Sequence, residues 1–74
     1  MLIENKVALT VNEASEYTGI GRNTLRNLIR WDKLPVIRIG NKVVIRRDDL
    51  DRFLSENRNN DLRNRFQVIA LKQG

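Results

Sequence analysis

The chain of 74 residues contains neither cysteine nor histidine. Without cysteine it forms no disulfide, offers no thiolate ligand to a metal and has no cysteine nucleophile. Without histidine it lacks the commonest general base and the commonest metal ligand in proteins. It also has no glycine-rich loop that would cradle phosphates. An enzyme is therefore the least expected class of protein, and no cofactor is predicted.

Long apolar runs are missing as well. No stretch approaches the roughly 20 apolar residues that a membrane-spanning helix requires, so no membrane partner is expected. The first six residues, Met-Leu-Ile-Glu-Asn-Lys, lack the apolar run of a secretory signal. We therefore expect a cytoplasmic protein. With 41% hydrophobic residues, the chain suffices for one small domain with a modest core.

Acidic residues are scarce in the middle of the chain. Residues 19–47 contain eight lysines and arginines and one acid, Asp32, so this stretch has a charge of +7. The remaining residues sum to −2, which leaves +5 for the whole chain. A positive block confined to one part of the sequence is typical of a protein that binds nucleic acid.

Residues 22–30, inside this positive block, predict a short amphipathic helix. Leu25, Leu28 and Ile29 have i, i+3, i+4 spacing and would share one face, which must be buried. The other side contains arginines and amides and no acid; these residues are Arg22, Asn23, Arg26, Asn27 and Arg30. Such side chains pair with phosphate oxygens and with the edges of guanine and adenine. We predict that this helix lies in a DNA groove, although a solvated basic face is the usual interpretation of such a helix alone.

A first helix is predicted directly before it. Thr10 and Glu13 fit the capping-box pattern, so the helix begins just after Thr10. Its predicted inner face consists of Val11, Ala14 and either Tyr17 or Thr18. The short apolar run at residues 7–9 either forms a brief strand or packs on the core.

Gly19-Ile20-Gly21 is predicted to be the turn between the two helices, because glycine permits the steep change of direction. The two helices and this turn make a helix-turn-helix. Gly21 would cap the second helix without a side-chain oxygen. The hydroxyl of Thr24 has two open roles, a bond to a DNA phosphate or a bond to the preceding turn. Trp31, at the end of the second helix, is expected to pack against the hairpin that follows, with stacking on a DNA base as the alternative.

Residues 36–46 predict a β-hairpin, because two β-branched runs flank the two-residue loop Gly40-Asn41. Alternation along the strands predicts one apolar face, which includes Ile37 and Ile39, and one face rich in bases. The polar side chains near the tip are Arg38, Asn41 and Lys42. Bases on an edge strand can protect it from aggregation. Since these follow a basic helix, we favour contact with DNA, either along the backbone or in the minor groove.

Residues 47–56 predict a third helix with Asp48 as its N-cap. Leu50, Phe53 and Leu54 make the apolar stripe that closes the core. The aspartates at its start suit the positive end of the helix dipole, and we do not predict a metal site from them.

Residues 1–57 are thus predicted to form the domain, and residues 58–74 a C-terminal tail. A polar break at residues 57–61 precedes six apolar residues, which are Leu62, Phe66, Val68, Ile69, Ala70 and Leu71. This number is too large for a solvated arm. The tail either docks on the core or offers these side chains to a partner, and the sequence leaves both open.

The chain resembles the MerR-like winged helix-turn-helix of the excisionase family over about residues 9–55. The matching stretches are Leu9–Tyr17, Gly19-Ile20, Arg22–Leu25, Leu28-Ile29, Leu34–Gly40, Val44–Arg47 and Asp49-Leu50. The resemblance implies an α+β fold in which a helix-turn-helix is followed by a two-stranded hairpin wing and a third helix. Two residues depart from the family pattern. Thr18 replaces a usual leucine, and Gly21 replaces a capping serine or aspartate.

The same resemblance implies which residues contact double-stranded DNA. The second helix would enter the major groove with Arg22, Asn23, Thr24, Arg26, Asn27 and Arg30. The wing would contact the adjacent minor groove with Arg38, Asn41 and Lys42, while Arg46 and Arg47 lie near the DNA backbone. Members of the family often bind repeated sites, which allows cooperative self-association, bend DNA and assist a tyrosine integrase.

Three functions remain open from the sequence. The leading hypothesis is an excisionase, or recombination directionality factor, of a phage or other mobile element in a bacterium. In that role its C-terminal tail would bind the tyrosine integrase. The second is a small MerR-like transcriptional regulator, although the chain has no room for a long dimerisation helix. The third is an adaptor whose tail and third helix bind a partner protein, while DNA contact is incidental.

Overall fold

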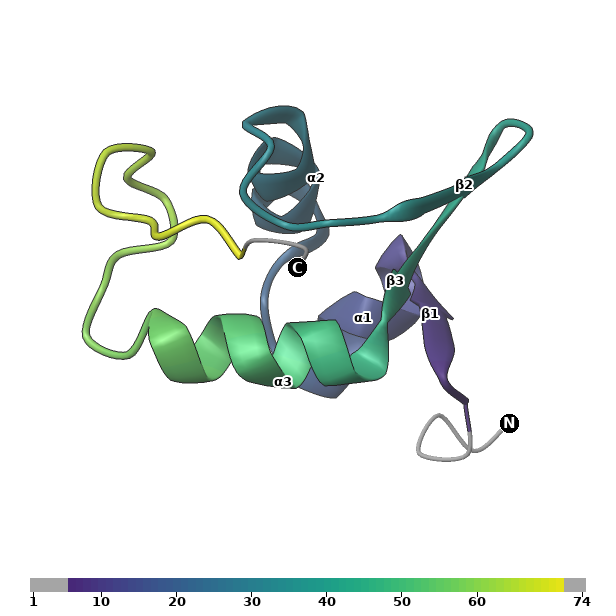
Figure 1. Cartoon of the computed structure of the whole chain (residues 1–74), viewed down its shortest axis with the longest axis horizontal. Helices are drawn as coiled ribbons and strands as arrows, with labels where there is room; N and C mark the ends of the chain where they lie inside the picture. The colour runs from purple at the N-terminus through teal and green to yellow at the C-terminus, as the bar shows by residue number, and fades with distance from the viewer. Residues whose placement is uncertain (1–5, 72–74) are drawn as a thin grey trace.

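The computed structural model describes residues 6–71, which form a helix-turn-helix, a small antiparallel sheet and a third helix. The elements are β1 (Ala8–Thr10), α1 (Val11–Thr18), α2 (Arg22–Arg30), β2 (Ile37–Ile39), β3 (Lys42–Arg46) and α3 (Arg47–Glu56). Figure 1 shows α3 along one side of the molecule, α2 on the opposite side, and the β2–β3 hairpin projecting beyond both. This is the α+β winged helix-turn-helix that the sequence predicts.

Local side-chain chemistry sets both ends of α1. The backbone N–H of Thr10 donates to Glu13 Oε1 at 3.0 Å, and the N–H of Glu13 donates to Thr10 Oγ1 at 3.2 Å. The predicted capping box is therefore present. At the other end Gly19 has φ +78°, which glycine adopts without a steric penalty, and its N–H donates to the carbonyl of Ser15 at 2.8 Å.

Thr18, one of the two departures from the family pattern, contributes polar bonds to the turn. Its hydroxyl donates to the carbonyl of Ala14 at 2.7 Å and accepts from the N–H of Ile20 at 3.1 Å. Gly21, the other departure, precedes α2 as its N-cap and supplies no side-chain hydrogen bond, as expected.

The three strands are antiparallel in the order β1-β3-β2. β1 answers the open question about the run at residues 7–9, because Leu9 pairs with Ile45 and both side chains are fully buried. The predicted two-stranded wing is thus anchored at its base by a third strand. β3, which lies between the other two, continues directly into α3.

The register of the hairpin contradicts the predicted separation of apolar and basic faces. Ile37 pairs with Val44, and Ile39 pairs with Lys42. Directly paired residues of an antiparallel sheet point to the same side. The two isoleucines therefore share a face with Lys42 and are 44% and 59% exposed. Arg38, paired with Val43, points to the other face.

The start of α3 also differs from the prediction. Its N-cap is Arg46, and no side chain caps the helix. Asp48 lies in the first turn, where its carboxylate binds the side chain of Arg46. The acid still suits the positive end of the helix dipole, so its electrostatic role survives although its capping role does not.

One apolar core joins all these elements. Its buried residues are Leu9, Ala14, Leu25, Leu28, Leu34, Ile45, Leu50, Phe53, Val68 and Leu71. Val68 and Leu71 belong to the predicted tail, so the described part of that tail docks on the core. Residues 58–71 contain no helix or strand. Within residues 6–71, no helix has the length and apolar character needed to cross a membrane.

Asn57 fastens the C-terminal segment to α3. This side chain is buried, and its amide group donates to the carbonyls of Phe53 and Ile69 at 3.0 Å each. Its Oδ1 accepts the backbone N–H of Ile69 at 2.7 Å. A buried amide with both ends satisfied holds the segment in one position.

Replacement of Asn57 by alanine should lower the free energy of unfolding by about 1–3 kcal/mol, because it leaves buried backbone groups without partners. Urea denaturation followed by circular dichroism measures this change. The exposed neighbour Arg58 is the matched control, and Arg58→Ala should stay within about 0.5 kcal/mol of the parent protein. Equal stability of the two variants would show that Asn57 does not anchor the segment.

Candidate nucleic-acid interface

α2 presents two chemically different faces. Leu25 and Leu28 are fully buried, and they fix the orientation of the helix against the core. The outward face carries arginines and small polar side chains and no acid; Arg22, Asn23, Arg26 and Arg30 are exposed, and Thr24 and Asn27 are half-buried. The predicted groove-helix residues are therefore brought together on one surface, away from the core.

The arginines of α2 have weak partners within the protein. Arg22 Nη1 donates to Asn12 Oδ1 at 3.4 Å, and Arg26 Nη1 donates to Asn23 Oδ1 at 3.4 Å. Both distances lie beyond the usual range for such bonds. Among residues 6–71 no carboxylate forms an ion pair with either arginine or with Arg30. These guanidinium groups can therefore turn to a ligand at little cost.

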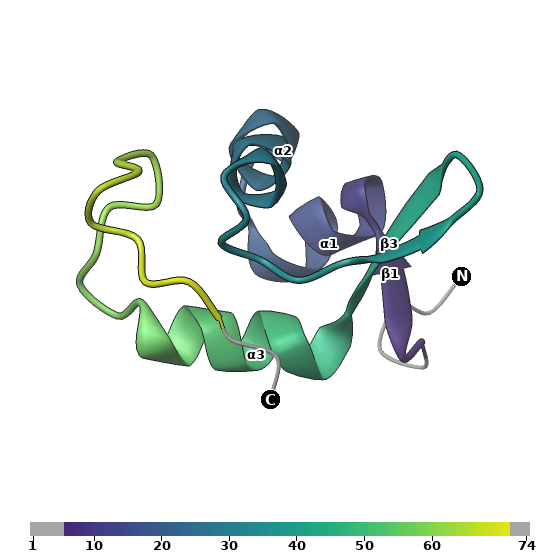
Figure 2. The same ribbon diagram turned by 45° about the horizontal axis from the view of Figure 1, so that its top comes forward.

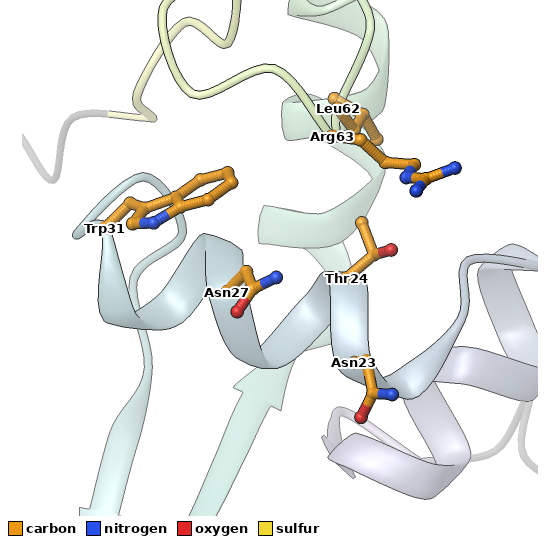
Figure 3. Close-up of a pocket in the computed structure, with 6 residues that line it drawn as sticks. All are labelled: Asn23, Thr24, Asn27, Trp31, Leu62 and Arg63. Atoms are coloured by element: carbon orange, nitrogen blue, oxygen red, sulfur yellow. The ribbon is translucent and has the colours of Figure 1, made fainter.

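A hollow lies along one side of α2. Figure 3 shows the residues that line it, which are Asn23, Thr24, Asn27, Trp31, Leu62 and Arg63. Trp31 lines this hollow together with Leu62 and Arg63 of the C-terminal segment, and it is partly buried against the core. Its expected packing against the hairpin stays a prediction. The Thr24 hydroxyl makes no hydrogen bond within the described residues, so the bond to the preceding turn, one of its two open roles, is not formed.

The tip of the hairpin carries the predicted wing residues. Arg38, Asn41 and Lys42 are exposed, and none has a side-chain partner within residues 6–71. Gly40 has φ +59°, a conformation that suits glycine at the first position of a two-residue hairpin loop. Figures 1 and 2 both place the tip and α2 on the sides of the molecule away from α3.

Arg46 lies at the opposite end of β3 from the tip, and its side chain is occupied. Its Nε and Nη2 donate to the two carboxylate oxygens of Asp48 at 3.0 Å each. This bidentate contact lowers the pKa of Asp48 and raises the pKa of Arg46. Arg46 would have to exchange this carboxylate for a phosphate in order to contact DNA.

Arg47 is half-buried at the junction of β3 and α3, where its backbone N–H donates to the carbonyl of Val7 at 2.8 Å. Nearby, the Tyr17 hydroxyl donates to Asp51 Oδ1 at 2.8 Å, which raises the pKa of Tyr17. This contact joins α1 to α3. Arg46 and Arg47 therefore lie at the junction of β3 and α3, at the end of the hairpin opposite its tip.

Arg63 is a basic residue beside this surface that is not among the predicted DNA-contacting residues. It lies outside the apparent helix-turn-helix pattern, in a segment interpreted as a tail. The sequence nevertheless contains a local indication that Arg63 lies in a structured turn. Asp61 and Asn64 are turn-forming residues on either side of it, and a side chain in a structured turn has a defined direction.

The ion pair between Arg46 and Asp48 can be tested by titration. Arg46→Gln should raise the pKa of Asp48 toward its ordinary value, because the charge-assisted hydrogen bonds are the largest cause of its lowering. Carboxyl carbon chemical shifts followed by NMR against pH measure this pKa. Arg26→Gln, which makes the same charge change on α2, should leave the titration of Asp48 where it is; an unshifted Asp48 in both variants would contradict the pairing.

Comparison with known proteins identifies the family to which this chain belongs. Residues 8–58 match the family described as the helix-turn-helix domain, a range that contains every helix and strand described above. This family of DNA-binding domains includes excisionase-like proteins. Neither the search of curated proteins nor the search of solved structures gave a match. Since the match covers more than half of the chain, this protein belongs to the helix-turn-helix domain family and binds double-stranded DNA.

Proposed function

We propose that the protein recognises a specific DNA sequence with α2 in the major groove and with the hairpin tip in the adjacent minor groove. The observation that carries this proposal is the outward face of α2, where arginines and amides have no carboxylate partner among residues 6–71. The family match to a DNA-binding domain supports it independently. The opposite face of α2 is committed to the core, so the polar face is the one available to DNA.

Each part of this surface has a separate chemical task. Arginine pairs with the O6 and N7 atoms of guanine, and asparagine pairs with the N6 and N7 atoms of adenine, so Arg26 and Asn23 are proposed to read bases. Arg22, Thr24, Asn27 and Arg30 surround them on the same helix. Lys42 is proposed to contact backbone phosphates, which adds affinity without sequence preference.

The wing residues follow the same division. Arg38 and Lys42 point to opposite faces of the hairpin, so a tip lying in a minor groove presents one basic side chain to each wall of the groove. Asn41 lies in the loop between them. Arg46 and Arg47 are proposed to face flanking backbone phosphates, at the end of the hairpin remote from the tip.

We further propose that the protein is an excisionase that bends attachment-site DNA and assists a tyrosine integrase. The resemblance to excisionases and the family match support this role. So do two exposed apolar side chains of the C-terminal segment, because Phe66 is 90% exposed and Ile69 is 51% exposed. A phenylalanine left almost wholly in solvent is a candidate contact for a protein partner. These two are proposed to contact the integrase or a second copy of the protein on a repeated site.

Base-reading and phosphate-binding residues should respond differently to substitution. Arg26→Ala should reduce discrimination between the preferred site and other sequences by about 1–3 kcal/mol, because a bidentate base contact is lost. Lys42→Ala should weaken binding to all duplexes alike and reduce the salt slope by about one.

Fluorescence anisotropy on a site selected from random duplexes, and on a scrambled duplex, measures both effects over a series of salt concentrations. Glu56→Gln on α3 should change neither the discrimination nor the slope. Loss of discrimination in Lys42→Ala, with discrimination retained in Arg26→Ala, would reverse the assigned roles.

The excisionase role is tested by excision in vitro with a tyrosine integrase from the same genome. The protein should stimulate excision, and Phe66→Ser should abolish the stimulation while DNA affinity stays unchanged, because this side chain is exposed and does not belong to the core. Val7→Ser, which also removes an exposed apolar side chain, is the control. Absence of stimulation, together with tight binding to promoter DNA, would favour the small transcriptional regulator.

A further inference from the structure

The turn at residues 61–67 lies beside α2, on the side away from the β2–β3 hairpin in both ribbon views (Figures 1 and 2). Arg63 of this turn lines the same hollow as Asn23, Thr24 and Asn27. Figure 3 shows the Arg63 side chain extending past Thr24, with its guanidinium group at the outer end. α2 is therefore flanked by basic side chains on both sides, the hairpin tip on one and Arg63 on the other.

The guanidinium group of Arg63 is available for binding. The residue is exposed, and its side chain has no hydrogen bond or ion pair within residues 6–71. Asp61, the nearest acid along the chain, accepts a hydrogen bond from the backbone N–H of Arg63 at 2.9 Å and forms no ion pair with its side chain. Nothing within the described protein neutralises this charge.

The turn that carries Arg63 is built as a structured element. The N–H of Asp61 donates to Gln67 Oε1 at 3.0 Å, and the N–H of Phe66 donates to Asn64 Oδ1 at 3.0 Å. Directly after it, Val68 is buried in the core. A charged side chain on an ordered turn loses less conformational entropy on binding than one on a loose tail.

We propose that Arg63 is a third DNA-contacting element, which binds a backbone phosphate on the side of the major groove opposite the wing. A helix in the major groove has a phosphate backbone along each side, roughly 12 Å apart. The hairpin would contact one of these two phosphate backbones, and Arg63 is placed to contact the other. The proposal rests on the proposed insertion of α2, and it adds a contact from outside residues 8–58, the range that matches the family.

A phosphate contact positions the protein and does not read sequence. Arg63 therefore increases affinity for every duplex and limits how far α2 can tilt in the groove. It also gives the C-terminal segment a role on DNA, distinct from that of its exposed Phe66.

The test compares Arg63→Ala and Arg63→Lys with Arg52→Ala. Arg52 lies on α3, on the other side of the molecule from α2, so its replacement makes the same charge change at a remote place. Binding to a selected site and to a scrambled duplex is measured by fluorescence anisotropy over a series of salt concentrations. Thermal melts of each variant check folding, which Arg63 should not affect because its side chain has no hydrogen bond or ion pair within residues 6–71.

Arg63→Ala should bind both duplexes several-fold more weakly, with the salt slope reduced by about one and discrimination unchanged. Arg63→Lys should retain the slope, because a phosphate contact needs the charge. Arg52→Ala should match the parent protein.

Two outcomes overturn the inference in distinguishable ways. If Arg63→Ala keeps the parent affinity and slope while Arg26→Ala loses discrimination, Arg63 has no role and the proposed function stands. If the parent protein itself shows no salt-dependent binding to either duplex, the proposed function fails and this inference fails with it.

Discussion

The burial of Leu25 and Leu28 is the constraint on which the rest of the structure depends. These two side chains fix the rotation of α2, and the rotation decides which residues face outward. Their full burial contributes roughly 1.5–3 kcal/mol each, a large share of what so small a domain can gain. Because the same packing both stabilises the domain and aims Arg26, recognition and stability are coupled in this helix.

The sheet fixes the position of the wing relative to the core. β3 pairs with β1 at its base, where Leu9 and Ile45 are buried together, and extends beyond the core toward the loop at Gly40. The tip therefore projects from a fixed base at a defined distance from α2. Its isoleucines remain exposed on the same face as Lys42.

The C-terminal segment contributes to both the core and the surface. Asn57 and Val68 attach it to the domain, although residues 58–71 have no helix or strand. The attachment places Leu62 and Arg63 against one side of α2 and leaves Phe66 in solvent. A segment that resembles a tail in composition is thus a structured edge of the proposed DNA-binding surface.

The sequence by itself determined the features that depend on neighbours along the chain. The capping box of Thr10, the turn at Gly19, the two-residue hairpin loop and the apolar face of α2 were all predictable, because each follows from contacts within a few residues. The tertiary structure alone decided the partner of Arg46, the pairing of residues 8–10 as a third strand and the docking of Val68. These depend on contacts between distant segments, whose geometry is set by packing of the whole core and leaves no periodic pattern in the sequence.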